Sequence, residues 1–279
     1  MLVEKIVSKQ NPLVKRFRRV RLGSEPHHIF IEGSRLIEDA LRSGAHFESV
    51  AFTPIFEASE RGGALIEEFK QVRCRGAVIT QPILEAIADT ESPQGIVAII
   101  SRPYYELGDL FTDTVPLLII ADGLQDPGNL GSIIRTAEAA GASGLITTRL
   151  TVNSFNLKAL RASMGSAFRL PIAMHIANEA IVEICRERSI KLVATKVGLG
   201  PTLEDAARAP KILPHTEVDL TVPVAFILGR EASGISAELT AHTDTFIHIP
   251  MAAGIESLNV AAAATVLLYE AARQRGFQF

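Results

Sequence analysis

The sequence is poor in cysteine and has no hydrophobic run long enough to cross a membrane. Only two of its 279 residues are cysteines, Cys74 and Cys185, and they form no C-x-x-C pair. This argues against a disulfide framework or a zinc site and favours a reducing compartment. The first residues lack the apolar segment of a secretory signal. The longest apolar run, 260–269, is shorter than the roughly 20 residues that a membrane span needs. We expect a cytoplasmic protein with no membrane partner.

Several common catalytic patterns are also missing. The chain contains no G-x-G-x-x-G fingerprint and no G-x-x-x-x-G-K loop, which argues against a standard dinucleotide-dependent oxidoreductase and against a P-loop enzyme. The seven histidines show no metal-ligand spacing, and no Ser-His-Asp grouping is visible. We therefore expect no metal. The hydrophobic share of 47% and the charged share of 21% are ordinary for a globular protein of one large or two smaller domains.

Positive charge is concentrated at the start of the chain. Residues 1–22 hold seven lysines and arginines against one glutamate, although the whole chain has a net charge of −3. Such a block attracts polyanions such as RNA. It can equally be a solvated helix face, and the interleaved Leu13, Val14 and Phe17 also allow it to pack. We treat residues 1–28 as a basic N-terminal arm or helix.

Two regions of α/β texture follow. In the first, 29–102, strands are expected at 29–33, 49–52, 77–79 and 95–100, and helices at 35–41, 65–72 and 81–87. Residues 103–116 have weak periodicity and two prolines, and we place a linker there. In the second region, 117–279, apolar strands are expected at 117–121, 144–148, 190–195 and 224–228, with a helix at 130–140. Strands that alternate with helices favour a parallel sheet covered on both faces.

Three polar loops of the second region follow strands, so they can meet at the carboxyl edge of the sheet. The first holds Asn129 before a helix whose Arg135 either seeks an anion or pairs with Glu138. The second holds two glycines, at 229 and 234, which allow a close approach to a ligand. In the third, a short apolar strand at 249–251 runs into polar residues that precede an alanine-rich helix. There, Ser257 and Asn259 stand where side chains cap helices.

Taken together and in order, the three loops resemble the three motifs of the SpoU (TrmH) family of RNA ribose 2′-O-methyltransferases. The similar stretches are DGLQDPGNLGSIIRTA at 122–137, FILGREASGIS at 226–236, and IPM at 249–251 with ESLNVA at 256–261. Ala232 stands where the family usually has glycine. The first region resembles the L30e-like substrate-binding domain of the same family, through FIEG at 30–33 and QGI at 94–96.

The resemblance implies a C-terminal parallel-sheet SPOUT domain with a deep trefoil knot, preceded by a small L30e-like α/β domain. It also implies a homodimer formed through the C-terminal domain, with S-adenosyl-L-methionine as the cofactor. The cofactor contacts that it implies are Thr195, Leu228, Gly229, Ile249, Met251 and Leu258. The catalytic residues are Asn129, Arg135, Glu231, Ser257 and Asn259. A guanidinium stays protonated, so we favour Arg135 as a clamp on phosphate or ribose rather than as a base.

An enzyme of this family acts on structured RNA and needs phosphate contacts beyond its catalytic pocket. We expect Lys15, Arg16, Arg18, Arg19 and Arg35 to make them. A separate N-terminal module with a basic segment favours 23S rRNA as the target, by analogy alone. A tRNA 2′-O-methyltransferase is one alternative. A catalytically inactive RNA-binding or ribosome-assembly protein is another, and the intact motif residues argue against it.

Overall fold

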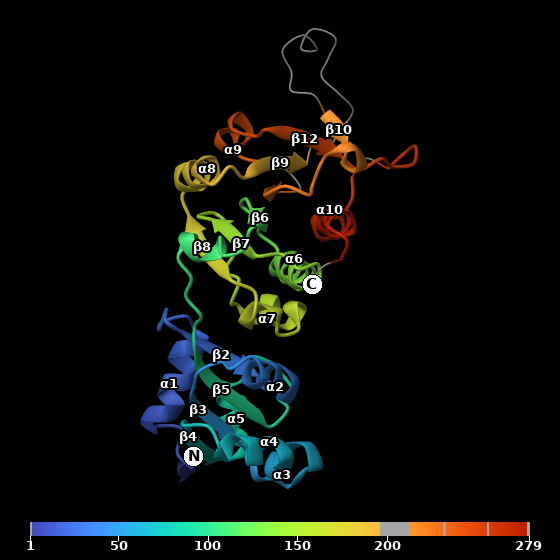
Figure 1. The fold of residues 1–279 in the computed structure, drawn as a ribbon. Helices are drawn as coiled ribbons and strands as arrows, with labels where there is room; N and C mark the ends of the chain where they lie inside the picture. Colours follow the sequence, from blue (N-terminus) through green and yellow to red (C-terminus); the bar gives the residue numbers. More distant parts are fainter. Residues whose placement is uncertain (1, 196–211, 231–232, 256, 278–279) are drawn as a thin grey trace. The chain divides into compact units, whose positions relative to one another are not determined.

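The structure is a computed structural model that describes residues 2–195, 212–230, 233–255 and 257–277 (Figure 1). The chain divides into two compact units. Unit 1 comprises Met1–Pro103 with Phe155–Leu157, and unit 2 comprises Tyr104–Ser154 with Lys158–Phe279.

Unit 1 is built on a five-stranded mixed sheet of order β1-β4-β3-β5-β2. Strands β1, β4 and β3 run parallel, and β5 is antiparallel to both of its neighbours, β3 and β2. Its strands are β1 (Leu2–Ile6), β2 (His28–Glu32), β3 (Phe47–Phe52), β4 (Arg75–Ile79) and β5 (Ile96–Ser101). Its helices are α1 (Pro12–Arg21), α2 (Ser34–Arg42), α3 (Pro54–Ala58), α4 (Glu60–Lys70) and α5 (Gln81–Ile87). The strands and helices predicted for 29–102 are therefore present, with shifted ends.

The basic N-terminal segment is an integral part of unit 1 and not a separate arm. Strand β1 pairs with β4 along its whole length. Helix α1 starts where the Asn11 side chain accepts the Leu13 N–H, and it buries an apolar stripe that includes Phe17. The Phe17 ring meets Phe30 of β2 edge to face. Of the alternatives considered from the sequence, the segment therefore packs: its interleaved residues Leu13, Val14 and Phe17 are buried.

Unit 2 is built on a seven-stranded sheet of order β10-β12-β9-β11-β6-β7-β8. All six of its strand pairs are parallel. Its strands are β6 (Leu117–Ala121), β7 (Gly144–Thr148), β8 (Ile172–Ile176), β9 (Lys191–Thr195), β10 (Ile212–Pro214), β11 (Val224–Leu228) and β12 (Thr245–His248). Its helices are α6 (Pro127–Ala139), α7 (Leu157–Ser163), α8 (Asn178–Glu187), α9 (Ala237–Ala241) and α10 (Val260–Gln274), with short 3-10 turns at Leu107–Leu110, Ser166–Phe168 and His215–Glu217.

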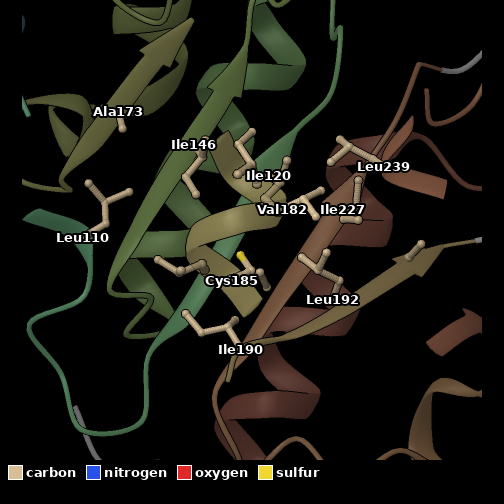
Figure 2. Packing of buried hydrophobic residues seen from close by; sticks show 14 of the residues in the cluster. Leu110, Ile120, Ile146, Ala173, Val182, Cys185, Ile190, Leu192, Ile227 and Leu239 are labelled. Carbon is tan, nitrogen blue, oxygen red and sulfur yellow. The ribbon is translucent and has the colours of Figure 1, made fainter. Parts of the chain in front are cut away.

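The sheet of unit 2 is buried on both faces, as its continuous apolar strands predict. On one face, Ile120, Ile146, Leu192 and Ile227 pack with α8 and α9, as Figure 2 shows. Alternate residues of the same strands, such as Ile119, point to the opposite face and are fully buried as well. Helices α6 and α10 lie on that side (Figure 1). The parallel, doubly covered sheet is therefore confirmed. The knot stays a prediction, because residues 196–211 lie outside the described part of the chain.

Two expectations about this region are wrong in detail. The stretch 103–116 is not a plain linker, because Leu107–Leu110 form a 3-10 turn whose Leu110 is fully buried in the core of unit 2. The apolar strand expected at 249–251 lies earlier, at Thr245–His248. Pro250 has no N–H for a sheet hydrogen bond, and it restricts the backbone of the residue before it, so the strand ends first.

Candidate functional site

Three neighbouring strands of unit 2 bring three of the six residues predicted to contact the cofactor into one row. Strand β9 lies between β12 and β11, and the three strands are parallel. Their register pairs Ile247 with Thr195 and Ile227 with Ala194. Thr195, Leu228 and Ile249 therefore stand at the carboxyl ends of three neighbouring strands. Ligands of parallel sheets bind at this edge.

The first loop ends in a capped helix. Asp126 is the N-cap of α6 and accepts the backbone N–H of Asn129 at 2.7 Å, while Lys158 Nζ lies 2.8 Å from its other oxygen. These two interactions, with Lys158 the stronger, lower the pKa of Asp126. Helix α6 begins at Pro127, so Asn129 lies within its first turn and not in the preceding loop. This fixes the side-chain direction of Asn129 by helix geometry.

Asn129 of the first loop and Asn259 of the third are in direct contact. Asn259 Nδ2 donates to Asn129 Oδ1 at 3.0 Å. Asn259 is also the N-cap of α10, and its Oδ1 accepts the N–H groups of Ala261 and Ala262. Further along, Thr136 Oγ1 and Thr265 Oγ1 are 3.4 Å apart. The two pairs are spaced similarly on each helix, so α6 and α10 run side by side in the same direction.

Arg135 is exposed and makes no hydrogen bond or ion pair with any residue that the structure describes. It precedes Thr136, so it points about 100° around α6 from the stripe that faces α10. Glu138, the partner considered from the sequence, instead pairs with Arg169 at 2.5 Å. Arg135 is thus a cation at the surface of α6, beside the seam with α10.

The second loop turns back on itself immediately after β11. The N–H of Arg230 donates to the Gly234 carbonyl at 3.0 Å, and the reverse bond is 2.9 Å. A Cβ on Gly229 would lie 2.4 Å from the carbonyl carbon of Gly234, so only glycine fits there. Glu231, with the neighbouring Ala232, lies outside the described residues.

The remaining predicted residues of the third loop are exposed. Met251, Ser257 and Leu258 face solvent, with Leu258 39% exposed, and no hydrogen bond joins Ser257 to Asn259 or Arg135 among the described residues. Sequence reasoning placed these residues at the site as a group. Among the described residues, the structure joins Asn129 with Asn259 and aligns Thr195, Leu228 and Ile249 by register.

Three of the four arginines expected to contact RNA already have partners within unit 1. Arg16 contacts Glu48 at 2.6 Å and Glu25 at 3.1 Å. Arg19 pairs with Glu25, and Arg18 Nε donates to the Ala86 carbonyl at 3.3 Å.

Lys15 and Arg35 differ from these three arginines. Both are exposed, and neither has a hydrogen-bond or ion-pair partner among the described residues. They are therefore the two whose donors are open to a phosphate.

Sequence reasoning missed a polar network beneath the row of strand ends. Asp122 and Gly123 follow β6 and bond to the second loop at three points, through Leu228, Arg230 and Ser236. The hydroxyls of Thr148 and Thr151 join the same network. The only signal in the sequence is a polar residue and a glycine directly after a buried strand.

A cavity of about 560 Å³ lies away from these strand ends. It opens at the amino end of β9, where Lys191, Cys185 and Asp244 line it. This is the opposite end of the strand from Thr195. No helix of the described ranges is long and apolar enough to cross a membrane, and those ranges contain no cluster of three or more potential metal ligands.

Comparisons with known proteins agree with this geometry. Residues 116–269 match the model of the SpoU rRNA Methylase family, and residues 11–98 match that of the MRM3-like substrate binding domain. The 23S rRNA (guanosine(2553)-2′-O)-methyltransferase RlmP of Bacillus subtilis is 30% identical over 96% of this chain and 98% of its own.

Two solved structures are similar over almost the whole chain. The AdoMet-bound rRNA methyltransferase from Sinorhizobium meliloti has a TM-score of 0.82 and 29% identity, covering 97% of this chain and 98% of that one. The SpoU methyltransferase AviRb from Streptomyces viridochromogenes, in complex with AdoMet, has a TM-score of 0.82 and 27% identity, covering 95% and 98%. A family match over more than half of the chain, carried by the stretch that holds all three loops, means that this protein belongs to the SpoU rRNA methylase family.

Proposed function

We propose that the protein transfers a methyl group from S-adenosyl-L-methionine to a ribose 2′-hydroxyl of structured RNA, with 23S rRNA as its target. The observation that carries this proposal is the row of Thr195, Leu228 and Ile249, which lies at the carboxyl edge of a sheet in a family of rRNA methylases. The relative RlmP and the AdoMet-bound neighbours support the substrate and the cofactor respectively.

The residues present suit this cofactor. Leu228 is buried, and Gly229 is half-buried and packs closely against the Gly234 backbone, so we expect peptide groups at this strand end to meet an adenosine. Gly229, Ile249, Met251 and Leu258 would make the remaining contacts. When bound, S-adenosylmethionine supplies an electrophilic methyl group on a sulfonium.

Arg135 would hold the RNA at the reacting centre. Its guanidinium stays protonated and offers several donors, so it can clamp a phosphate or the ribose and stabilise the negative charge that develops on the 2′-oxygen. The Asn129–Asn259 bond would fix the two loops on either side of that oxygen. Ser257 and Glu231 complete the proposed catalytic set.

RNA contacts outside the site would come from unit 1. Lys15 and Arg35 have open donors, whereas Arg16, Arg18 and Arg19 must release or share an internal partner to bind phosphate. We therefore assign the first pair the larger contribution.

A homodimer through unit 2 forms part of the proposal. Ile255, Leu258 and Tyr269 are 57%, 39% and 43% exposed, and they belong to the third loop and the helix that follows it. Large apolar side chains that stay exposed in the chain favour an interface, and these three are candidates for it. Light scattering after gel filtration tests this, because Tyr269→Lys should produce monomers if α10 forms the contact.

A cytoplasmic location is proposed from the chemistry of the cysteines. Cys74 and Cys185 are both free, and burial raises the pKa of Cys185 to about 12. Thiols that are kept reduced fit the cytoplasm. Cell fractionation tests the location.

The decisive experiment combines transfer and mapping. The purified protein is incubated with labelled S-adenosylmethionine and with rRNA or tRNA that lacks the modification, and 2′-O-methyl positions are then mapped. Label on a ribose of 23S rRNA is the expected result. Label only on tRNA would overturn the target, and binding of RNA without any transfer would overturn the enzymatic function.

A further inference from the structure

The polar network behind the second loop connects that loop to the end of β6 at its entry, its middle and its exit. The Asp122 N–H donates to the Leu228 carbonyl at 2.8 Å. Arg230 Nε donates to the Gly123 carbonyl at 2.9 Å. The Ser236 N–H donates to Asp122 Oδ2 at 2.7 Å. Two consecutive residues, Asp122 and Gly123, therefore hold both ends of the loop that follows Leu228 and begins at Gly229.

Asp122 is held firmly in its own position. Its side chain is 6% exposed, and its other oxygen accepts the Thr148 hydroxyl at 3.1 Å. No described cation forms an ion pair with this carboxylate. A buried carboxylate satisfied only by neutral donors is costly, and each missing donor would leave it unsatisfied. Such a group holds its donors in one geometry.

The absence of a side chain at Gly123 leaves room for the bond from Arg230. The φ of Gly123 is +70°, and a Cβ there would lie 2.4 Å from Arg230 Nε. Its N–H donates to the hydroxyls of Thr148 and Thr151 at 3.0 and 2.9 Å. The Thr151 hydroxyl in turn donates to the Ala121 carbonyl at 2.7 Å. The Arg230 guanidinium thus lies on a backbone that two threonines fix from the other side.

We propose that Asp122 and Arg230 are positioning residues, which hold Leu228 and Gly229 in the conformation that binds S-adenosylmethionine. The inference rests on the proposed function, because it assumes that Leu228 and Gly229 meet the cofactor. It assigns Arg230 to the protein backbone and not to an RNA phosphate. Neither Asp122 nor Arg230 touches the reacting atoms, so both act through the loop.

Titration calorimetry of the full chain with S-adenosylmethionine, without RNA, tests the proposal. Asp122→Ala should weaken cofactor affinity about tenfold or more, because it removes two charge-assisted hydrogen bonds. Asp122→Asn keeps an acceptor for the Ser236 N–H and a polar partner for Thr148, so it should stay within about threefold of the parent. Arg230→Met should cost about tenfold and serves if Asp122→Ala does not fold.

Two control variants remove similar groups elsewhere. Glu32 in unit 1 is also 6% exposed, and it accepts the Asp89 N–H at 2.7 Å and the Thr90 hydroxyl. Arg275 in unit 2 donates to backbone carbonyls, including that of Leu220 at 2.8 Å. Glu32→Ala and Arg275→Met should lower the unfolding temperature and leave cofactor affinity unchanged.

The possible outcomes distinguish failure of this inference from failure of the proposed function. Loss of affinity in Asp122→Ala and Arg230→Met, with rescue by Asp122→Asn and none in the controls, supports positioning. Unchanged affinity in both variants overturns this inference alone, and so does an equal loss in the control variants. A parent protein that binds no S-adenosylmethionine overturns the proposed function together with it.

Discussion

Units 1 and 2 both surround a sheet with helices, but only in unit 2 do all paired strands run the same way. In unit 1, β5 runs against the other four strands, so the segment after β5 leaves the sheet at the opposite edge from the loops after β1, β2, β3 and β4. In unit 2 every strand is parallel to its neighbours, and the loops after β6, β9, β11 and β12 leave at one edge. Loops therefore converge at one edge of both sheets, but the three polar loops that resemble the family motifs belong to unit 2, and the small-molecule site is expected there.

Each unit holds arginines that have a partner within the unit and cations that have none among the described residues. In unit 1, Arg16 and Arg19 are balanced by Glu25 and Glu48 at the surface. In unit 2, Arg230 is fastened to a backbone carbonyl and Arg135 has no partner among the described residues. The comparison teaches that a run of basic residues does not by itself make a basic surface, because folding can bring carboxylates to it.

The largest expected effect separates chemistry from cofactor binding within unit 2. Arg135→Ala should abolish measurable methyl transfer, because the variant cannot clamp the RNA. S-adenosylmethionine affinity should change by less than about twofold, since the row of strand ends is intact. Transfer of labelled methyl and calorimetry measure the two quantities. Arg149→Ala, which removes another exposed arginine of unit 2, is the control. Equal loss of transfer and cofactor affinity would contradict the proposed division of roles.

The next effect tests whether the carboxyl edge of unit 2 is the cofactor site. In Gly229→Ala the new Cβ would meet the backbone of Gly234 at 2.4 Å, so the loop must move. We expect at least about tenfold weaker binding of S-adenosylmethionine. Gly108→Ala introduces the same methyl group in unit 2 where no heavy atom lies within 4 Å, and it should bind normally. Normal binding by Gly229→Ala would remove this loop from the site.

A smaller effect tests the contrast between open and paired cations in unit 1. Replacing Lys15 and Arg35 together with glutamine should weaken RNA binding several-fold and lower the slope of log affinity against log salt by about 0.7–0.9 for each phosphate that is no longer neutralised. Arg16→Gln with Arg19→Gln should change the slope less, since both are paired with carboxylates. Filter binding at several salt concentrations measures both. A larger effect of the second pair would show that RNA displaces the internal partners.

The smallest effect concerns acid stability within unit 2. Arg273, with help from Gln274, lowers the pKa of Glu270 from 4.5 to about 2. A carboxyl whose pKa is depressed by folding stabilises the folded state above its unfolded pKa, and that contribution disappears as the pH falls from about 4.5 towards 2. Glu270→Gln should therefore lower the unfolding temperature by a few degrees at pH 7 and reduce its fall in acid. An unchanged pH profile would show that this pair contributes nothing.

Much of the fold followed from local pattern. The continuous apolar run at 117–121 indicated a buried parallel strand, and β6 is fully buried. The polar start of the alanine-rich helix indicated a cap, and Asn259 caps α10. Strands β1, β8 and β10 were not predicted, because short strands at or near a sheet edge are stabilised by their neighbours more than by their own composition.

The sequence by itself determined the alternation of strands and helices, the three loops that resemble a methyltransferase family, and their order. Only the tertiary structure decided that Thr195, Leu228 and Ile249 share one row, since strand order and register depend on pairing between distant segments. It also decided that Arg16 and Arg19 are paired while Arg35 is open, and that Asp122 holds the second loop. These facts depend on which side chains and strands folding brings together, which neither composition nor periodicity encodes.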